Sequence, residues 1–383
     1  MNIVFNFSLA VSLLVTLVFS EEAEAHVLKS KKSDKTKVPK IKHKKLKKAN
    51  TKNENEPCMK VILTGTIGGP LLFNGLAGPG TLVTYGTEGN DCSDLKMQVD
   101  FGRGTTLRLS ELGIVPNDID AAFITHMHSD HTDDLSNFMQ YRWHFLGQPI
   151  DVVCSEDVAV FDRTMSCTQL VSNIDAAFKA SGEIDQRLAE NSNRNPGGPS
   201  ALGNVSAFPL TEDPEIVWES PDGAVQVEAI RVNHIGGSCA FRFNTPAGNV
   251  TISGMAANDS LDMETRPHST SDNVEKIANG SNLLVHSVVH PILGPTGGSG
   301  FPPPLYARQS NAPDIGSLAE RAGVPNVMLY HLLPALNNPL HAIWEVPGGA
   351  LKKEDYKDSI FSGGYSGNVY VGGDLLTIKL PME

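Results

Sequence analysis

The heptapeptide THMHSDH, at residues 125–131, constrains the fold of this chain more than any other stretch. It follows the apolar run DIDAAFIT at residues 118–125, whose composition predicts a β-strand that ends in a polar cluster. Side chains two residues apart on extended backbone point the same way, so His126 and His128 are placed to bind one metal ion from one side. The sequence therefore predicts a strand that delivers two histidines to a metal site.

The second half of the heptapeptide predicts a second metal ion. Asp130 and His131 lie past the bend where the strand gives way to a helix, which helical spacing of apolar residues predicts over residues 131–145. From there both side chains can reach an ion beside the first. Imidazole and carboxylate donors suit zinc, iron or manganese, and a cluster without thiolates is not a structural zinc clip.

Alternating strand and helix patterns on both sides of the motif favour an α/β fold, with helices covering β-sheets in one large domain. A helix is expected over residues 158–178, and residues 180–224 are expected to be less regular. The other expected strands are 60–67, 81–85, 96–101, 150–154, 225–233, 239–244, 249–253, 283–289 and 326–330, with helices at 105–112 and 312–322 and a mixed end closing with 368–380.

The first 25 residues are predicted to be a secretory signal peptide. An almost unbroken apolar run from Ile3 to Ser20 precedes Ala23-Glu24-Ala25, a small-x-small site, so cleavage is expected after Ala25. An uncleaved membrane anchor is the alternative, because the run is long enough to span a bilayer and no basic residue precedes it. The prediction is an exported protein, secreted or periplasmic.

Residues 26–57 are predicted to form a disordered, Lys-rich linker. Residues 29–52 hold 12 lysines and almost no apolar side chains, so they cannot bury a core. We expect a solvated spacer, and the sharper alternative is a tether to anionic lipid, polysaccharide or nucleic acid. The chain has 31 basic and 43 acidic residues, of which 12 and 4 lie in residues 1–52. The remainder therefore carries 19 against 39, a net charge of −20.

The five cysteines include no C-x-x-C pair. Because five is odd, an exported protein keeps at least one free thiol. Cys58 and Cys92 are a candidate disulfide pair, which the sequence alone does not settle.

Six further stretches accompany the HxHxDH motif, and together they resemble the metallo-β-lactamase superfamily, in its ribonuclease Z-like and arylsulfatase-like branch. They follow the order of that family and cover about residues 58–380. The stretches are LTGTIGGP (63–70), MQVDFGRGTTLRL (97–109), VNHIGGSCAFRF (232–243), NVTISG (249–254), LVHSVVHP (284–291) and VMLYHLLP (327–334). The resemblance implies an αββα sandwich, two mixed β-sheets flanked by helices, over residues 58–383.

The resemblance also implies two metal sites with different donors. The first set holds three histidines and the second set includes a carboxylate: His126, His128 and His234, then Asp130, His131 and His331. Asp100 would orient one of the histidine ligands. Zinc is the expected cofactor, as one or two ions, with manganese or iron as alternatives.

Met255 departs from the family pattern. In that family the residue after Ser-Gly is an aspartate that bridges both metals, whereas a thioether is a poor ligand for zinc, manganese or iron. Two divalent ions without a bridging carboxylate repel each other more strongly. Three outcomes stay open. The protein binds firmly only the ion at His126, His128 and His234, or Asp259 takes the place of the missing bridging aspartate, or the site has little catalytic activity. We expect a weakened second metal site and an activity reduced by Met255.

Two histidines outside these sets, His286 and His290, are candidate proton donors to a leaving group. A buried strand histidine satisfied by backbone is the alternative for His290. In the expected mechanism a metal-activated water attacks a phosphorus, sulfur or carbonyl centre, and Asp130 orients the water or accepts its proton. The predicted function is an exported metal-dependent hydrolase of a phosphodiester, sulfate ester or related ester.

Two other functions stay open. A ribonuclease Z-type tRNA 3′-processing endonuclease is disfavoured by the net charge of −20 beyond residue 52, since proteins bind RNA largely through its phosphates. A catalytically weak binding protein on the same fold is favoured only by Met255 and its neighbours. The expected partner is a small-molecule ester and nucleic acid is disfavoured. The Lys-rich tail is a candidate contact for anionic surfaces, and a homodimer is left open.

Overall fold

The computed structural model describes residues 53–382, except residues 161 and 261–266. The predicted signal peptide and most of the predicted linker lie outside the described residues, so both stay predictions. The described residues form one compact unit. No helix in the described part of the chain is long and apolar enough to cross a membrane.

Two seven-stranded β-sheets form the centre of the fold, and each mixes parallel and antiparallel pairs. The first sheet has the strand order β18 (Thr377–Leu380), β1 (Pro57–Gly65), β2 (Gly80–Thr87), β3 (Leu95–Val99), β4 (Ala121–Phe123), β5 (Ile150–Ser155) and β8 (Gly203–Phe208). The second has the order β17 (Asn368–Val371), β14 (Asn326–Leu333), β13 (Leu283–Val289), β12 (Gly248–Ile252), β11 (Cys239–Thr245), β10 (Gln226–Arg231) and β9 (Glu215–Glu219).

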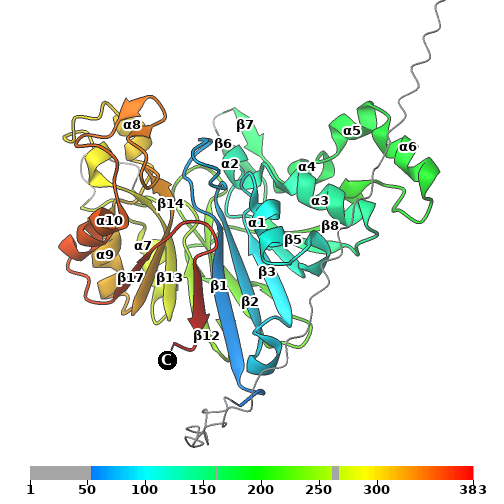
Figure 1. The fold of residues 1–383 in the computed structure, drawn as a ribbon, viewed down its shortest axis with the longest axis horizontal. Helices are drawn as coiled ribbons and strands as arrows, with labels where there is room; N and C mark the ends of the chain where they lie inside the picture. The colour runs from blue at the N-terminus through cyan, green and yellow to red at the C-terminus, as the bar shows by residue number, and fades with distance from the viewer. Residues whose placement is uncertain (1–52, 161, 261–266, 383) are drawn as a thin grey trace, which may run out of the picture. The chain divides into compact units, whose positions relative to one another are not determined.

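Helices cover the outer face of each sheet, which confirms the predicted αββα arrangement of mixed sheets (Figure 1). The first sheet is flanked by α1 (Thr105–Glu111), α2 (Ser129–Thr132), α3 (Leu135–His144), α4 (Cys167–Ser172), α5 (Ala176–Ala180) and α6 (Glu183–Glu190). The second carries α7 (Asp272–Ala278), α8 (Pro303–Tyr306), α9 (Ala312–Arg321) and α10 (Lys353–Ser362). Single 3₁₀ turns lie at Glu88–Asn90, Pro116–Asp118, Pro199–Leu202 and Pro291–Leu293.

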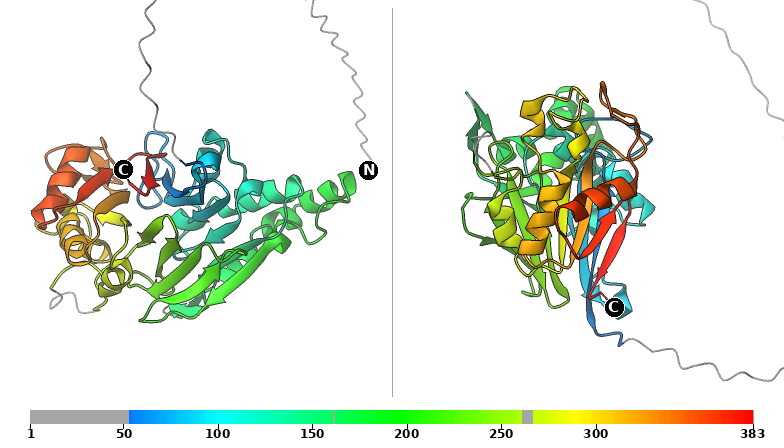
Figure 2. Two further views of the ribbon diagram at one scale, coloured as in Figure 1. Left: turned by 90° about the horizontal axis from the view of Figure 1, so that it is seen from below. Right: turned by 90° about the vertical axis from the view of Figure 1, so that its left-hand side faces the viewer.

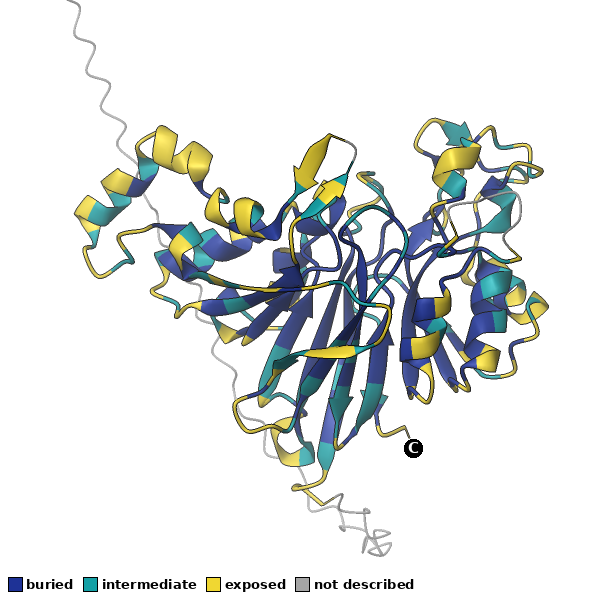
Figure 3. Ribbon diagram, turned by 180° about the vertical axis from the view of Figure 1, so that it is seen from behind, coloured by how far each residue is buried: buried dark blue, intermediate teal, exposed yellow. Residues whose placement is uncertain are grey.

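Burial follows this layering. Every residue of β13 and of β14 is buried, as expected for parallel strands covered on both faces. The helices α5 and α6 instead project from the layers with most side chains exposed (Figure 3). Strand β18 pairs antiparallel with β1 and brings Leu380 opposite Met59, so the last strand completes the sheet beside the first (Figure 2).

Two helix predictions are wrong in part. Residues 158–160 and 163–165 are strands, because Val158–Val160 (β6) pairs with Arg163–Met165 (β7), and helix α4 begins only at Cys167. β-branched valines favour extended backbone, which the helical spacing of the segment had concealed. The helix predicted over residues 131–145 is interrupted between α2 and α3.

Four cysteines form two disulfides. The candidate pair Cys58–Cys92 is joined, and a second disulfide links Cys154 at the end of β5 to Cys167 at the start of α4. Cys239 is a buried free thiol. A further small hairpin pairs β15 (Leu340–His341) with β16 (Trp344–Glu345).

The two sheets meet through a layer of apolar side chains in which Phe123 is central. Its ring lies 5.7 Å from Trp218, 5.4 Å from Phe241 and 5.2 Å from Phe243, centroid to centroid and all edge-on. These three rings belong to the second sheet, whereas Phe123 ends β4 in the first. The residue that precedes the histidine motif by three positions therefore joins the sheets.

Phe123→Ala is expected to lower the free energy of unfolding by about 3–5 kcal/mol, because it removes a fully buried aromatic ring and leaves a cavity between the sheets. Urea denaturation followed by circular dichroism measures the change. Phe178→Ala is the control, since Phe178 is 36% exposed on α5. Equal effects of the two substitutions would contradict a central role of Phe123.

Candidate metal centre

Six side chains gather where strands of both sheets end, in the two groups that the sequence predicted. The first group is called the three-histidine triad and the second the aspartate triad: His126, His128 and His234, then Asp130, His131 and His331. In each group the candidate ligand atoms all lie within 4.8 Å of one another. His126 and His128 follow β4, and α2 carries the next two residues. His234 follows β10, and His331 belongs to β14.

The three-histidine triad aims its ring nitrogens at one point. His128 Nδ1 lies 3.1 Å from His126 Nε2 and 3.4 Å from His234 Nε2. The other nitrogen of His234, Nδ1, donates a hydrogen bond of 2.9 Å to the backbone carbonyl of Arg308. That bond fixes the ring so that Nε2 faces the triad, the arrangement in which proteins hold metal-binding imidazoles.

The aspartate triad lies against the first. Asp130 Oδ2 is 3.4 Å from His331 Nε2 and 3.7 Å from His131 Nε2. The rings of His126 and His131 approach to 4.1 Å between centroids, so the two triads adjoin. His131 Nε2 is buried and has no hydrogen-bond partner in the described part of the chain. A buried lone pair without a donor fits a metal ion at this position.

Asp100 ties the two triads to the sheet. Its Oδ2 lies 2.7 Å from His131 Nδ1 and accepts a 2.8 Å hydrogen bond from the Thr125 hydroxyl, while its Oδ1 accepts one from the Thr125 backbone N–H. The same hydroxyl lies 3.1 Å from His126 Nδ1. Asp100 therefore contacts a ligand candidate of one triad directly and of the other through Thr125. The sequence prediction that Asp100 orients a histidine agrees with these contacts.

The protonation states suit cation binding. Burial lowers the pKa of His126, and it lowers the pKa of His234 to about 3, so both rings are neutral at pH 7 with a free lone pair. Burial alone would raise the pKa of Asp130, but the hydrogen bond with His331 and the neighbouring His131 hold it well below its usual value. Asp130 is therefore an ionised carboxylate.

A β-bulge presents His331 to the triad. Ser287 of β13 pairs with Tyr330 and Val288 with Leu332, which leaves His331 as the extra residue of β14. Its φ of 48° lies in the left-handed region, which a bulged residue can adopt and which turns its side chain out of the regular pleat. Gly68 leaves room for it, because a Cβ there would lie 2.7 Å from His331 Nδ1.

Met255 reaches the same place as the triads. It follows Gly254, whose φ is 60° and whose added Cβ would lie 2.9 Å from Thr125 Cβ, so glycine is required beside the histidine motif. Met255 is 4% exposed and lines a cavity of about 290 Å³ together with His128, Asp130, His234 and His331. This space is called the central cavity.

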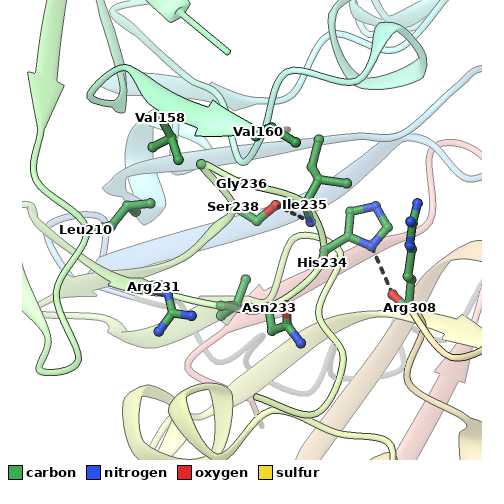
Figure 4. A pocket seen from close by; sticks show the side chains of 12 residues that line it. Val158, Val160, Leu210, Arg231, Asn233, His234, Ile235, Gly236, Ser238 and Arg308 are labelled. Atoms are coloured by element: carbon green, nitrogen blue, oxygen red, sulfur yellow. Dashed lines mark hydrogen bonds between the residues drawn. The ribbon is translucent and has the colours of Figure 1, made fainter. Parts of the chain in front are cut away.

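A second cavity of about 360 Å³, the side cavity, lies beyond His234 (Figure 4). His234 and Arg308 line both cavities, and Figure 4 shows the hydrogen bond between them. Val158 and Val160 of β6 also line the side cavity, across from Arg231 and Asn233. The metal centre is therefore bounded by two cavities that share one histidine and one arginine.

Neither predicted proton donor lines the central or the side cavity. His286 is fully buried in β13, its Nδ1 donates to the Ser287 carbonyl, and burial lowers its pKa to about 4. His290 packs against the ring of Tyr356 and caps a 3₁₀ turn through Nδ1. Their position favours the structural role for His290 that the sequence left open.

Asp259 does not replace the missing carboxylate. Its oxygens accept hydrogen bonds from the Ser271 hydroxyl and the Asn273 backbone N–H at the start of α7. His341 and Gln309, by contrast, line the central cavity and were missed in the sequence. No motif marks them, because only the folded hairpin and loop bring them to the cavity.

Asp100→Asn is expected to weaken metal binding at the aspartate triad about 10–100-fold, because it removes the acceptor that orients and polarises His131. Competition with a chromophoric chelator measures the dissociation constant of each metal equivalent. Asp151→Asn is the matched control, since Asp151 lies on β5 of the same sheet and accepts a hydrogen bond from Trp218 instead. Unchanged affinity in Asp100→Asn would contradict its proposed role.

The chain is similar to several known proteins. A family model described as anti-Pycsar protein Apyc1 matches residues 90–162. Ribonuclease Z of Mycobacterium sp. (strain KMS) is 27% identical over 289 residues, which cover 75% of this chain and 88% of that protein.

Two solved structures share the fold. The metallo-beta-lactamase fold protein YhfI from Bacillus subtilis has a TM-score of 0.53 at 17% identity, over 85% of this chain and all of its own. The short form of human tRNase Z has a TM-score of 0.51 at 14% identity, over 84% and 100%. Together with the sheet order, these similarities show that the chain has the metallo-beta-lactamase fold and that its sequence is similar to that of ribonuclease Z.

Proposed function

We propose that the chain is an exported, metal-dependent phosphodiesterase with two metal sites, and that zinc is its first candidate ion. The observation that carries the proposal is the pair of adjoining triads, which open together on one cavity of about 290 Å³. A cavity of this size suits the reacting group of a small ester. Export rests on the sequence of residues 1–25 alone.

The chain contributes position and charge to the reaction. Metal ions held by the triads would supply an activated water and stabilise oxyanion charge. Asp130 stays ionised and borders the cavity, so its Oδ2 is placed to orient the attacking water or accept its proton. The Arg308 side chain borders the same cavity and neutralises part of the charge of a phosphodiester.

The purified full-length chain is expected to retain bound metal, measured by inductively coupled plasma mass spectrometry, and to hydrolyse bis(p-nitrophenyl) phosphate. His128→Ala and His331→Ala are expected to lower kcat/KM at least about 100-fold, because each removes a ligand candidate. His144→Gln, outside both triads, is the control. Metal-loaded protein without turnover of phosphodiesters or aryl sulfates would support the alternative of a binding protein.

Met255→Asp is expected to raise the affinity for the second metal equivalent at least about tenfold, because a carboxylate offsets the repulsion between two divalent ions. Met255→Leu is the control of similar size without charge. Isothermal titration with Zn²⁺ of the metal-free chain resolves the two equivalents. If the aspartate and leucine variants bind the second ion equally, the low affinity expected of that site does not come from Met255.

Ribonuclease Z activity is the second candidate, because relatives with that name align with 75% of the chain. Beyond residue 52 the chain has 39 acidic and only 19 basic residues, and this negative net charge argues against a polyanionic substrate. Cleavage of a precursor tRNA at its 3′ end, with kcat/KM above that for small diesters, would replace the first proposal with this one.

A further inference from the structure

Four exposed apolar side chains belong to the segments that line the central cavity, and together they are called here the apolar rim. Its members are Leu72, Leu305, Leu340 and Ile343, which are 78%, 41%, 42% and 83% exposed. Leu305 lines the cavity itself, and the others are sequence neighbours of the lining residues Leu71, His341, Ala342 and Trp344. Exposed apolar side chains on the segments that form a site can extend its binding surface.

Ile343 is the least expected member of the rim. It occupies the tip of the β15–β16 hairpin, in a two-residue turn whose first residue, Ala342, has a φ of 56°. Glycine, asparagine and aspartate favour such turns, because they tolerate left-handed backbone and solvent. A β-branched apolar residue at this exposed tip adds nothing to the core.

The wall below the rim is also apolar. Phe301 and Trp344 meet edge-on at 5.2 Å between centroids, and Leu333 and Met255 extend the same surface toward the triads. Arg308 is the one lysine or arginine among the residues that line this cavity. The surface therefore runs from a charged reacting end, at the triads and Arg308, through an apolar wall to the exposed rim.

From this gradient we infer that the substrate is an amphiphile: a phosphodiester that carries a long apolar chain, which lies along the cavity wall and emerges over the rim. The inference rests on the proposed phosphodiesterase function and names its substrate class. A compact ring would end inside the cavity and leave the rim without a contact, whereas a chain covers both. Each methylene moved from water to this surface strengthens binding.

Two diesters with the same leaving group test chain recognition: methyl p-nitrophenyl phosphate and octyl p-nitrophenyl phosphate, both below the micellar concentration. The full-length metal-loaded chain is expected to favour the octyl ester roughly 10–100-fold in kcat/KM, through a lower KM, which is the gain expected when a few methylenes leave water. Equal kcat/KM values for the two esters, with both turned over, would overturn the inference and leave the phosphodiesterase proposal standing.

Matched serine substitutions locate the effect. Leu72→Ser and Ile343→Ser are expected to reduce the octyl-to-methyl ratio about 3–10-fold, since each removes an apolar contact from the rim. Leu107→Ser and Ile216→Ser are the controls, because these residues are 64% and 54% exposed on α1 and β9, outside the cavity lining. A loss of the same size in the control variants would show a non-specific effect and overturn the inference.

A binding measurement separates the two proposals. Calorimetry with octylphosphonate and methylphosphonate, which contain no ester to hydrolyse, is expected to show tighter binding of the octyl compound that the rim variants weaken. Such binding without turnover of either diester would count against the phosphodiesterase alone. Binding to phosphatidylcholine vesicles without a chain-length effect on soluble phosphonates would identify a membrane-docking surface instead and overturn the inference.

Discussion

The geometry of the candidate metal centre depends on the hydrogen bonds of one buried carboxylate, that of Asp100. It directly follows β3 with a left-handed φ of 57°, and its two oxygens contact the Thr125 backbone N–H, the Thr125 hydroxyl and His131 Nδ1. A carboxylate that is 1% exposed needs such partners, because an ionised group without them is costly to bury. The same bonds set the path of the chain as it enters the histidine motif. The hydrogen bonds that make burial of the Asp100 carboxylate favourable are therefore the same bonds that orient the His131 ring.

Around that point the two sheets contribute unequal parts. The first sheet supplies four candidate ligands within one short segment, and the second supplies His234 and His331 from separate strands. The first segment needs only local backbone geometry, whereas the other two ligands need the sheets to be correctly packed through Phe123 and its aromatic neighbours. Stability of the inter-sheet core and assembly of the metal centre are thus linked.

The sequence predicted what depends on short-range chain geometry. His126 and His128 were recognisable because alternation on an extended segment places them on one side, and the sandwich followed from motifs in family order. The bulge at His331 depends on the register between β13 and β14, which no local pattern encodes. His341 reaches the cavity only through a tertiary hairpin contact, so its position was hidden as well. That the six residues bind metal stays a prediction, although the structure groups them as the sequence indicated.

The Asp374 carboxylate has a consequence for how the protein is made. It accepts hydrogen bonds from the Thr66 hydroxyl and the Ala77 backbone N–H and pairs with Arg108, so the loop that carries Leu71 and Leu72 is anchored by a residue near the C-terminus. During synthesis, the loop therefore lacks this anchor until Asp374 has left the ribosome. Strand β1 likewise lacks its hydrogen-bonding partner on one side until β18 is present. Nascent fragments that already contain THMHSDH but end before His234 and His331 therefore hold only part of the candidate ligand set.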